Sequence, residues 1–304
     1  MGDRLLPLAT ASDRRLGYPL NLPALDVLAL LRQYGLHPDK KLGQNFLIEP
    51  AALERVVAAA GNLEDQVVLE IGPGLGGLTR LLAARSRKVI AVEIDENLIP
   101  PLERVLSGFE NVSIVCGDIL KLDPAILVKE PDYFVVANIP YYITSALLRH
   151  LLEAEVHPNR MVLTVQQEVA ERICASPGDM SLLALGVQVY GHPRMMFRIS
   201  AGSFYPAPKV DSAVVRVDFF PEPRIPAYEL EIFFRLAKAG FSQKRKTLRN
   251  ALAAGLGLPA GQAEAMLDKA GVDPRRRAET LDLDEWNRLV EVYRGGIPGR
   301  SDVT

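Results

Sequence analysis

The stretch from residue 67 to residue 79 begins as an apolar, strand-like run and continues into glycines at Gly72, Gly74 and Gly77. Glycine lets the backbone turn tightly and lets a ligand approach without a Cβ in the way. A Gly-x-Gly-x-x-Gly spacing between a strand and a helix is typical of a nucleotide-cofactor site at the carboxyl edge of a parallel sheet. Alone the motif is only moderately specific, and a dinucleotide site is an open alternative.

Two acidic residues stand at the ends of the next two apolar runs. Glu93 ends the run 88–93, where a carboxylate can accept hydrogen bonds from ribose hydroxyls. Dinucleotide enzymes place an acid there too, so Glu93 does not discriminate. Asp118 follows the run 111–116 and is well placed to accept a hydrogen bond from an adenine amino group. Taken singly, Asp118 has an equally good explanation as a helix N-cap.

A fourth strand-like run, 132–137, ends on Asn138, Ile139, Pro140 and Tyr141. An adenine amino group is a poor nucleophile because its lone pair is delocalised into the ring. The Asn138 side-chain oxygen and the Ile139 carbonyl can accept the amino hydrogens, held in place by Pro140, so that the nitrogen turns pyramidal toward a methyl donor. Tyr141 can stack on a base extruded from its helix. The segment resembles the box of enzymes that methylate base amino groups, and this resemblance implies a catalytic site for base methylation.

A second aromatic residue, Phe204, precedes Tyr205 and Pro206 on a proline-stiffened loop. We expect Phe204 to complete a sandwich around the extruded base. The alternative, a core phenylalanine before a turn, is equally compatible with the residue pattern. Phe204 joins Asn138, Ile139, Pro140 and Tyr141 as a predicted catalytic residue.

These residues need a scaffold that brings the strand ends together. Apolar β-branched runs alternate with helical patterns, which indicates βαβ units, a mostly parallel doubly wound sheet and helices on both faces. Two later runs resemble a hairpin-like pair that closes the sheet. The expected strands span 66–71, 88–93, 111–116, 132–137, 160–166, 194–199 and 212–219, with helices near 77–84, 96–106 and 145–152.

Composition changes at residues 221–226, where three prolines in six residues resist helix and strand alike. Beyond them we expect a small all-helical domain over 227–304. The predicted catalytic domain spans 40–220. Residues 1–39 form an N-terminal extension with a short amphipathic helix at 23–34.

The overall composition narrows the class of protein. The 304 residues are 48% hydrophobic and 24% charged, which is typical of a soluble globular protein with a sizeable core. The two cysteines exclude a disulfide framework, and the four histidines lack metal-site spacing, so we expect no metal. The absence of a signal-peptide pattern or a membrane-spanning run favours the cytoplasm and no membrane partner.

A net charge of −2 gives no global sign of nucleic-acid binding, so any such function depends on local patches. The segment 241–249 contains four cations, Lys244, Arg245, Lys246 and Arg249, after an aromatic residue. We expect these four to contact RNA phosphates. A second cluster at 275–277 has no clear assignment, because a charge run is often only a solvated helix face.

The order of the strand-end motifs resembles S-adenosylmethionine methyltransferases, and Asn138–Tyr141 resembles the Asn/Asp-Pro-Pro-Tyr/Phe box of enzymes that methylate base amino groups. Together with KKLGQNFL, FYPAPKVDS and FSQKRKTLRNAL, the motifs resemble the KsgA/RsmA family of small-subunit ribosomal RNA adenine dimethyltransferases. The resemblance spans roughly residues 40–250.

This resemblance implies dimethylation of the exocyclic N6 amine of two adjacent adenosines near the 3′ end of small-subunit (16S) ribosomal RNA, with a role in small-subunit biogenesis. It implies a monomer that acts on the RNA or the immature subunit. It also implies cofactor contacts for S-adenosyl-L-methionine, with an N-terminal Gln-Asn-Phe-Leu element closing over it. The predicted cofactor residues are Asn45, Leu47, Gly72, Gly74, Glu93, Asp118 and Asn138.

Three alternatives compete with this interpretation. An NAD-dependent oxidoreductase accounts for the glycine loop but not for the second strand-end acid or the Asn-Ile-Pro-Tyr segment. A non-catalytic RNA-binding assembly factor could keep the fold, although an intact Asn138–Tyr141 argues against lost catalysis. Macrolide-resistance methyltransferases of the large-subunit RNA and mitochondrial transcription-factor relatives share the core, but the FYPAPKVDS and FSQKRKTLRNAL motifs favour the small-subunit enzymes.

Overall fold

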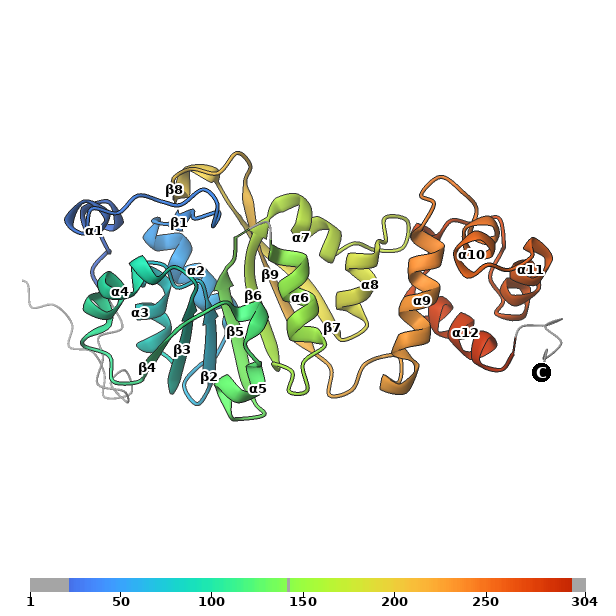
Figure 1. The fold of residues 1–304 in the computed structure, drawn as a ribbon, viewed down its shortest axis with the longest axis horizontal. Helices are drawn as coiled ribbons and strands as arrows, with labels where there is room; N and C mark the ends of the chain where they lie inside the picture. Colours follow the sequence, from blue (N-terminus) through green and yellow to red (C-terminus); the bar gives the residue numbers. More distant parts are fainter. Residues whose placement is uncertain (1–21, 141–142, 297–304) are drawn as a thin grey trace, which may run out of the picture. The chain divides into compact units, whose positions relative to one another are not determined.

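Seven strands form the central sheet, in the order β4-β3-β2-β5-β6-β9-β7 (Figure 1). The computed structural model describes residues 22–140 and 143–296. The strands of this sheet are β2 (Val67–Ile71), β3 (Lys88–Glu93), β4 (Val112–Cys116), β5 (Tyr133–Asn138), β6 (Arg160–Gln166), β7 (Gly191–Ile199) and β9 (Ser212–Phe219).

The parallel core predicted from the sequence is confirmed by the register of the strands. β2 pairs in parallel with β3 on one side and with β5 on the other, and β4 and β6 extend the sheet outward. The chain first winds from β2 toward β4 and then returns to place β5 beside β2. Ligands of doubly wound sheets bind where the winding direction reverses, at the carboxyl ends of the strands. Here that position lies beyond Ile71 and Asn138.

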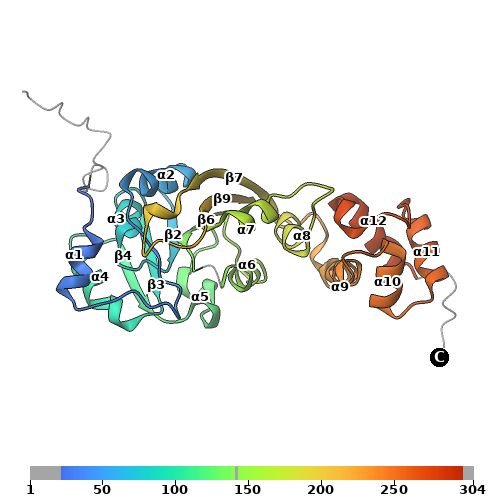
Figure 2. The same cartoon turned by 90° about the horizontal axis from the view of Figure 1, so that it is seen from above.

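Helices cover both faces of this parallel core. Figure 2 shows α2 and α3 on one face and α5 and α6 on the other. β2 is buried along its whole length, which explains its nearly continuous apolar sequence. The helices of this region are α1 (Val27–Gln33), α2 (Pro50–Ala60), α3 (Gly77–Ala83), α4 (Ile99–Leu106), α5 (Pro124–Val128) and α6 (Thr144–Leu152).

A second, two-stranded sheet lies outside the predicted elements. β1 (Phe46–Leu47) pairs antiparallel with β8 (Phe204–Tyr205), so that Phe46 faces Tyr205 and Leu47 faces Phe204 in the register. The pairing joins the Gln-Asn-Phe-Leu element to the segment that carries Phe204. Phe204 thus begins a short strand, where the sequence predicted a loop.

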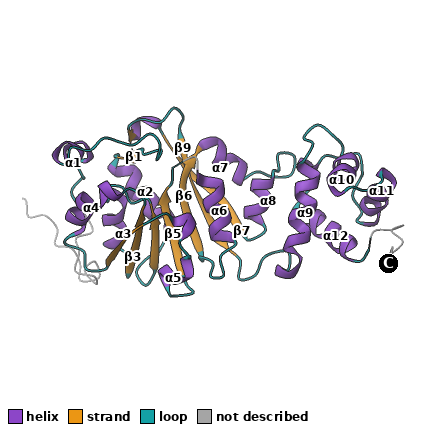
Figure 3. Cartoon of the chain, viewed as in Figure 1, coloured by secondary structure: helices purple, strands orange, loops and turns teal. Residues whose placement is uncertain are grey.

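By internal contacts the chain divides into two units, 1–167 with 196–216 and 168–195 with 217–304. The second unit contains α7 (Gln167–Ile173) except its first residue, α8 (Leu182–Gln188), α9 (Leu230–Phe241), α10 (Leu248–Leu256), α11 (Ala260–Lys269) and α12 (Leu283–Arg294), visible as separate helices in Figure 3. These units differ from the predicted functional domains 40–220 and 227–304, which remain a prediction.

The C-terminal helices pack around a buried aromatic core. Trp286 and Phe233 have no exposed surface, and the Phe241 ring stacks on Trp286 with 6.1 Å between centroids. α12 begins with a capping box in which Asp282 and Glu285 each accept from the other's backbone N–H. Across the described residues we find no helix with the length and apolar character needed to cross a membrane.

Candidate active site

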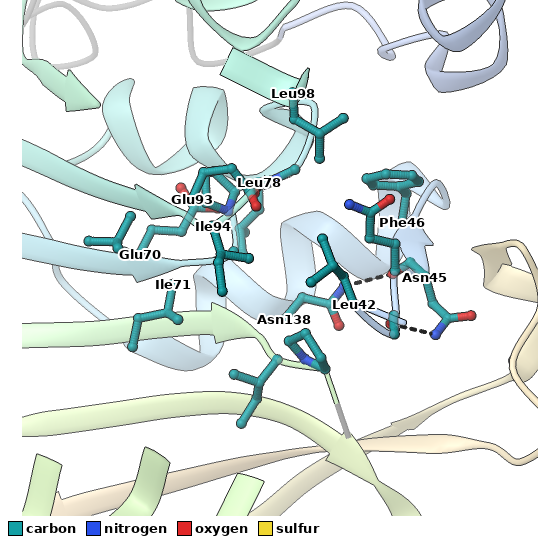
Figure 4. Close-up of a pocket in the computed structure, with 18 of the residues that line it drawn as sticks. Leu42, Asn45, Phe46, Glu70, Ile71, Leu78, Glu93, Ile94, Leu98 and Asn138 are labelled. Atoms are coloured by element: carbon teal, nitrogen blue, oxygen red, sulfur yellow. Dashed lines mark hydrogen bonds between the residues drawn. The ribbon is translucent and has the colours of Figure 1, made fainter. Parts of the chain in front are cut away.

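A cavity of about 230 Å³ opens at the carboxyl ends of β2, β3 and β5 (Figure 4). Its lining contains every predicted cofactor residue, together with Ile139 and Pro140. The structure therefore brings together side chains that the sequence placed on four strand ends and on the N-terminal segment. The predicted residues in the lining are Asn45, Leu47, Gly72, Gly74, Glu93, Asp118, Asn138, Ile139 and Pro140. Tyr141 lies outside the described residues.

The glycine loop after β2 needs glycine at three positions. Gly72, Gly74 and Gly76 have φ values of 70°, 58° and 84°, in the left-handed region that other residues rarely adopt. A Cβ on Gly74 would also lie 2.9 Å from the Phe46 ring. Gly77, the third glycine of the sequence motif, has no positive φ and begins α3, so the strained turn is completed by Gly76.

Glu93 is held in place by the glycine loop and by its own strand end. Its Oε2 accepts from the Gly74 backbone N–H at 3.0 Å and its Oε1 accepts from the Asp95 N–H at 2.9 Å. The side chain is buried, and burial raises its pKa, although these backbone hydrogen bonds oppose the rise. The carboxylate is thus fixed beside the cavity with lone pairs left for a ligand's hydroxyl groups.

Asp118 combines both roles that the sequence left open. Its Oδ1 accepts from the Leu120 N–H at 3.1 Å and caps a short 3-10 helix, Ile119–Lys121. The residue also lines the cavity. Lys121 Nζ is 3.7 Å from Oδ2, but the lysine side chain is 82% exposed, so this ion pair is weak and leaves the carboxylate able to accept from a ligand.

Asn138 ends β5 and connects it to the N-terminal segment. Its Nδ2 donates to the Asn45 carbonyl at 3.1 Å, a contact drawn in Figure 4. This bond uses the donor end of the amide, so Oδ1 is left as an acceptor, and among the described residues no group donates to it. A free carboxamide oxygen at the cavity wall is the arrangement that an amine substrate requires.

The segment 42–47 is fixed over the cavity by side chains from two directions. Gln44 donates through Nε2 to Asp95 Oδ2 at 2.7 Å and accepts from the Asp39 N–H at 2.8 Å. The Asn45 side chain turns back to the Gly43 carbonyl, at 3.0 Å, while its own carbonyl binds Asn138. These contacts make the segment a wall of the cavity.

Phe204 lies apart from the cavity lining. Its side chain is 3% exposed and belongs to the core cluster that contains Leu47 and Leu53. This burial favours the core role that the sequence left open as an alternative. Its neighbour Tyr205 is 37% exposed.

Glu70 is a functional candidate that the sequence reasoning missed. It lies within β2, lines the cavity and is 1% exposed. Burial raises the pKa of Glu70 to about 8, and repulsion from Glu93 adds to the rise, against the lowering effect of the neighbouring Thr79 hydroxyl. No described residue provides a hydrogen-bond partner for its Oε2. A lone acid inside the apolar run 67–71 was the signal that could have identified it.

The charge of the lining tests which cofactor fits the cavity. Its acidic side chains are Glu70, Glu93 and Asp118, and the described residues of the lining include no lysine, arginine or histidine. S-adenosyl-L-methionine carries positive charge on its sulfur and on its amino group, whereas a dinucleotide carries a negative diphosphate. Among the described residues, the charged side chains of the lining are all acidic and the Glu70 Oε2 has no partner, and both features fit S-adenosyl-L-methionine better than a dinucleotide.

The predicted RNA contacts lie in the second unit, with 244–246 between α9 and α10 and Arg249 in the first turn of α10. Lys244, Arg245 and Lys246 are exposed, and within the described part of the chain none of them forms an ion pair. Arg249 differs, because its Nη1 lies 3.1 Å from Glu264 Oε2. We name residues 244–246 the basic segment.

The second cluster of arginines is paired at every position. Arg275 contacts Asp273 at 3.2 Å, Arg276 contacts Glu285 at 2.5 Å and Arg277 contacts Glu279 at 3.7 Å. Arg276 also donates to the Thr280 carbonyl at 2.6 Å. Arg276 therefore fixes the turn before α12 as well as contributing charge.

Comparison with known sequences identifies relatives across most of the chain. Residues 36–294 match the family model described as ribosomal RNA adenine dimethylase. A protein of Dehalococcoides mccartyi (strain CBDB1), named ribosomal RNA small subunit methyltransferase A, is 47% identical over 88% of this chain and 92% of its own length. A protein of the same name from Pelotomaculum thermopropionicum is 42% identical, covering 88% of this chain and 95% of its own.

Comparison with solved structures gives the same fold. The 23S rRNA methyltransferase ErmE superposes with a TM-score of 0.67 at 32% identity, covering 82% of this chain and 99% of its own. A dimethyladenosine transferase from Plasmodium falciparum gives a TM-score of 0.71 at 27% identity, covering 83% and 98%. The Rossmann-like methyltransferase fold with a C-terminal helical region, predicted from the sequence, is confirmed.

A family match over residues 36–294 and relatives at 42–47% identity agree with the acidic cavity and with the asparagine at the end of β5. The chain belongs to the ribosomal RNA adenine dimethylase family, which consists of enzymes that depend on S-adenosyl-L-methionine.

Proposed function

We propose that this enzyme dimethylates the N6 amines of two adjacent adenosines near the 3′ end of small-subunit (16S) ribosomal RNA, during biogenesis of the small subunit. The names of the relatives from Dehalococcoides and Pelotomaculum support the small subunit as the source of the RNA. The observation that carries the chemistry is the position of Asn138 at the wall of an acidic cavity, where its side-chain oxygen accepts from no donor among residues 22–140 and 143–296.

Three acidic residues would hold the cofactor. Glu93 accepts from the ribose hydroxyls, Asp118 accepts from the adenine amino group, and Glu70 offers a buried carboxyl oxygen to a positively charged group. The Asn45 and Leu47 segment closes over the ligand. When bound, S-adenosyl-L-methionine supplies an electrophilic methyl group on a positively charged sulfur.

Asn138 and Ile139 would orient the amine of the target adenosine. The Asn138 Oδ1 and the Ile139 carbonyl accept the two amino hydrogens, which turns the nitrogen lone pair toward the methyl carbon. The methyl group supplied by the cofactor would replace one amino hydrogen, which would leave as a proton to solvent, while Asn138 and Ile139 hold the amine in place. A second methyl transfer to the same nitrogen replaces the remaining hydrogen.

The basic segment would bind the RNA backbone. Exposed cations without ion-pair partners attract phosphates, and their binding releases the counterions that had been condensed on the RNA. We propose Lys244, Arg245 and Lys246 as the main contacts and Arg249 as a weaker one, since Glu264 already neutralises part of its charge. We propose that Tyr141 holds the base, whereas the burial of Phe204 among core residues favours a role in packing.

We propose that the enzyme acts as a monomer on immature small subunits in the cytoplasm. Two free cysteines, one of them exposed, suit a reducing compartment.

The test is transfer of a labelled methyl group from S-adenosyl-L-methionine to under-methylated small subunits, followed by nucleoside analysis of the RNA. We expect dimethyladenosine at two adjacent adenosines near the 3′ end. Label in large-subunit RNA instead would reassign the substrate, in line with the similarity to ErmE. Cofactor binding without transfer to any ribosomal RNA would favour an assembly factor.

A further inference from the structure

Helix α1 lies outside the region that matches the family, because the match begins at residue 36 and α1 spans Val27–Gln33. None of the functions discussed above uses this helix. Val27 is nevertheless part of the cavity lining, and it is only 5% exposed. The N-terminal extension therefore reaches the cofactor cavity.

The buried face of α1 packs on the glycine-loop side of the cavity. Val27 and Leu31 form a hydrophobic cluster with Leu75 and Leu98, with Phe46 packed against it. Leu75 directly follows Gly74, whose N–H binds Glu93, and Leu98 follows soon after Glu93 in the chain. The helix thus packs against the residues of the lining that lie next to Glu93 and Gly74 in the chain.

Both ends of α1 are anchored. Before the helix, the Pro23 carbonyl accepts from Arg80 Nη2 at 2.5 Å, and Arg80 belongs to α3, the helix that follows the glycine loop. Asp26 caps the first turn by accepting from the Ala29 N–H at 2.9 Å. After the helix, the Leu36 N–H donates to the Leu31 carbonyl at 2.8 Å. The position of Val27 is therefore fixed by α3 and by its own cap.

We infer that α1 forms a wall of the cofactor site, with Val27 packed against the adenosine half of the bound ligand and away from its methionine half. Figure 4 shows Leu98 and Glu93 on one side of the cavity and Asn138 on another, and the buried residues that α1 packs against, Leu75 and Leu98, belong to the loop after Gly74 and to the helix that follows Glu93. The inference rests on the proposed cofactor contacts of Glu93 and Asp118. It assigns a function to residues 22–35 that the family match does not cover.

The experiment measures binding of two ligands to the full chain by calorimetry. S-adenosylhomocysteine contains both halves of the cofactor skeleton, and 5′-methylthioadenosine lacks the amino-acid half. For Val27→Ala we expect both affinities to fall by the same factor, on the order of tenfold, because methyl groups are removed from an apolar contact. Val27→Phe should weaken both ligands further, because its ring enters the cavity.

The control is Leu28→Ala on the same helix. Leu28 is 38% exposed and does not line the cavity, so both affinities should stay at the wild-type value. Thermal unfolding without ligand identifies a variant that is merely unstable. If Val27→Phe does not fold, Val27→Ile replaces it as the variant with a larger side chain. With isoleucine, a small change shared equally by both ligands is expected.

Two outcomes would overturn the inference. Wild-type affinity for both ligands in folded Val27→Ala and Val27→Phe would exclude a contact. Loss limited to S-adenosylhomocysteine would place α1 at the methionine half. If the wild-type chain itself bound neither ligand, the cofactor assignment would fail together with the inference, and that result differs from the other two.

Discussion

The cofactor cavity and the basic segment differ in both charge and exposure. The cavity presents Glu70, Glu93 and Asp118 with no basic side chain among the described residues of its lining. The basic segment, residues 244–246, presents three exposed cations without ion-pair partners in the described chain. One region suits a positively charged small ligand and the other a polyanion. An enzyme that must bind both substrates can therefore hold the positively charged cofactor in the acidic cavity and the phosphates of the RNA at the basic segment.

The difference also predicts how each region responds to solution conditions. Contacts with phosphates weaken steeply as salt rises, because binding releases counterions. Interactions inside a partly buried cavity are screened much less. Variants in one region should therefore change the binding of one substrate and leave the binding of the other intact.

The largest expected effect is on catalysis, from Asn138→Ala. The variant removes an acceptor for the amine, so methyl transfer should fall by roughly 10²–10³-fold, by analogy with the loss of one oriented polar group at a reacting centre. RNA binding should stay nearly intact, because no phosphate-binding group is removed. Single-turnover transfer and RNA affinity, measured on the same preparation, check this.

Asn138 also donates to the Asn45 carbonyl, so the alanine variant could act through the N-terminal segment. Affinity for S-adenosylhomocysteine separates the two effects. A loss of cofactor affinity as large as the loss of transfer would assign the defect to the segment. An equal loss of transfer and RNA binding would contradict the proposed role altogether.

The reverse effect is expected when Lys244, Arg245 and Lys246 are all changed to alanine. RNA affinity should fall by about 10- to 100-fold at moderate salt, and the slope of log affinity against log salt should decrease by about 2 to 3, because each cation that is removed leaves one phosphate with its counterions. Cofactor affinity should not change. Filter binding over a salt series measures the RNA affinity and its slope, and unchanged RNA binding would remove the basic segment from the interface.

A third prediction concerns the pH dependence of the cavity. The folded-state pKa of Glu70 is raised to about 8 from 4.5, so the folded protein binds this proton more tightly than the unfolded chain does. The contribution of Glu70 to stability is therefore greatest below pH 4.5 and is lost as pH rises toward 8. Glu70→Gln removes this dependence and should gain in stability relative to wild type between pH 5 and pH 9, by no more than about 5 kcal/mol.

Urea unfolding at the two pH values measures the gain, with Glu103→Gln on the exposed side of α4 as the matched control. The same Glu70 variant should bind S-adenosyl-L-methionine several-fold more weakly at pH 9, where the wild-type carboxylate is charged. A flat stability difference across this range would mean that Glu70 is not protonated in the folded protein.

The sequence predicted the elements that have strong local signals. The first and last residues of β3 and β6 were predicted correctly, because the apolar β-branched runs there are bounded by charged or amide side chains. α2 was missed, since Glu49 makes no side-chain cap and the helix is rich in small apolar residues without a clear polar face. β1 and β8 have two residues each and exist through a pairing across more than 150 positions, for which no local pattern exists.

The candidate site shows the same limit. The strand-end residues were predictable because parallel strands bring their carboxyl ends to one edge. The contribution of Val27 was not, since it depends on a helix that packs back onto Leu75 and Leu98. The contrast between the two clusters was only partly visible in the sequence: Asp273 and Glu279 lie two residues from the arginines they pair with, but Glu285, the partner of Arg276, lies on α12.

The smallest expected effect on RNA binding comes from the second cluster, and it gives the basic segment a control of equal charge. Changing Arg275, Arg276 and Arg277 to alanine removes three positive charges, as does the triple change at 244–246. Because each arginine is already paired with a carboxylate, RNA affinity should fall by less than about threefold. Stability should fall instead, by about 1–3 kcal/mol, since Glu285 and the Thr280 carbonyl lose their partner.

Arg276→Ala alone should produce most of that loss, because the side chains of Arg275 and Arg277 are 88% and 54% exposed while that of Glu285 is only 14% exposed. Chemical unfolding measures the loss of stability, and the same salt series measures the RNA affinity of both triple variants. If the two triple variants lose RNA affinity equally, pairing with carboxylates does not withdraw an arginine from the RNA. The interface would then include both clusters, and the distinction between them would concern folding only.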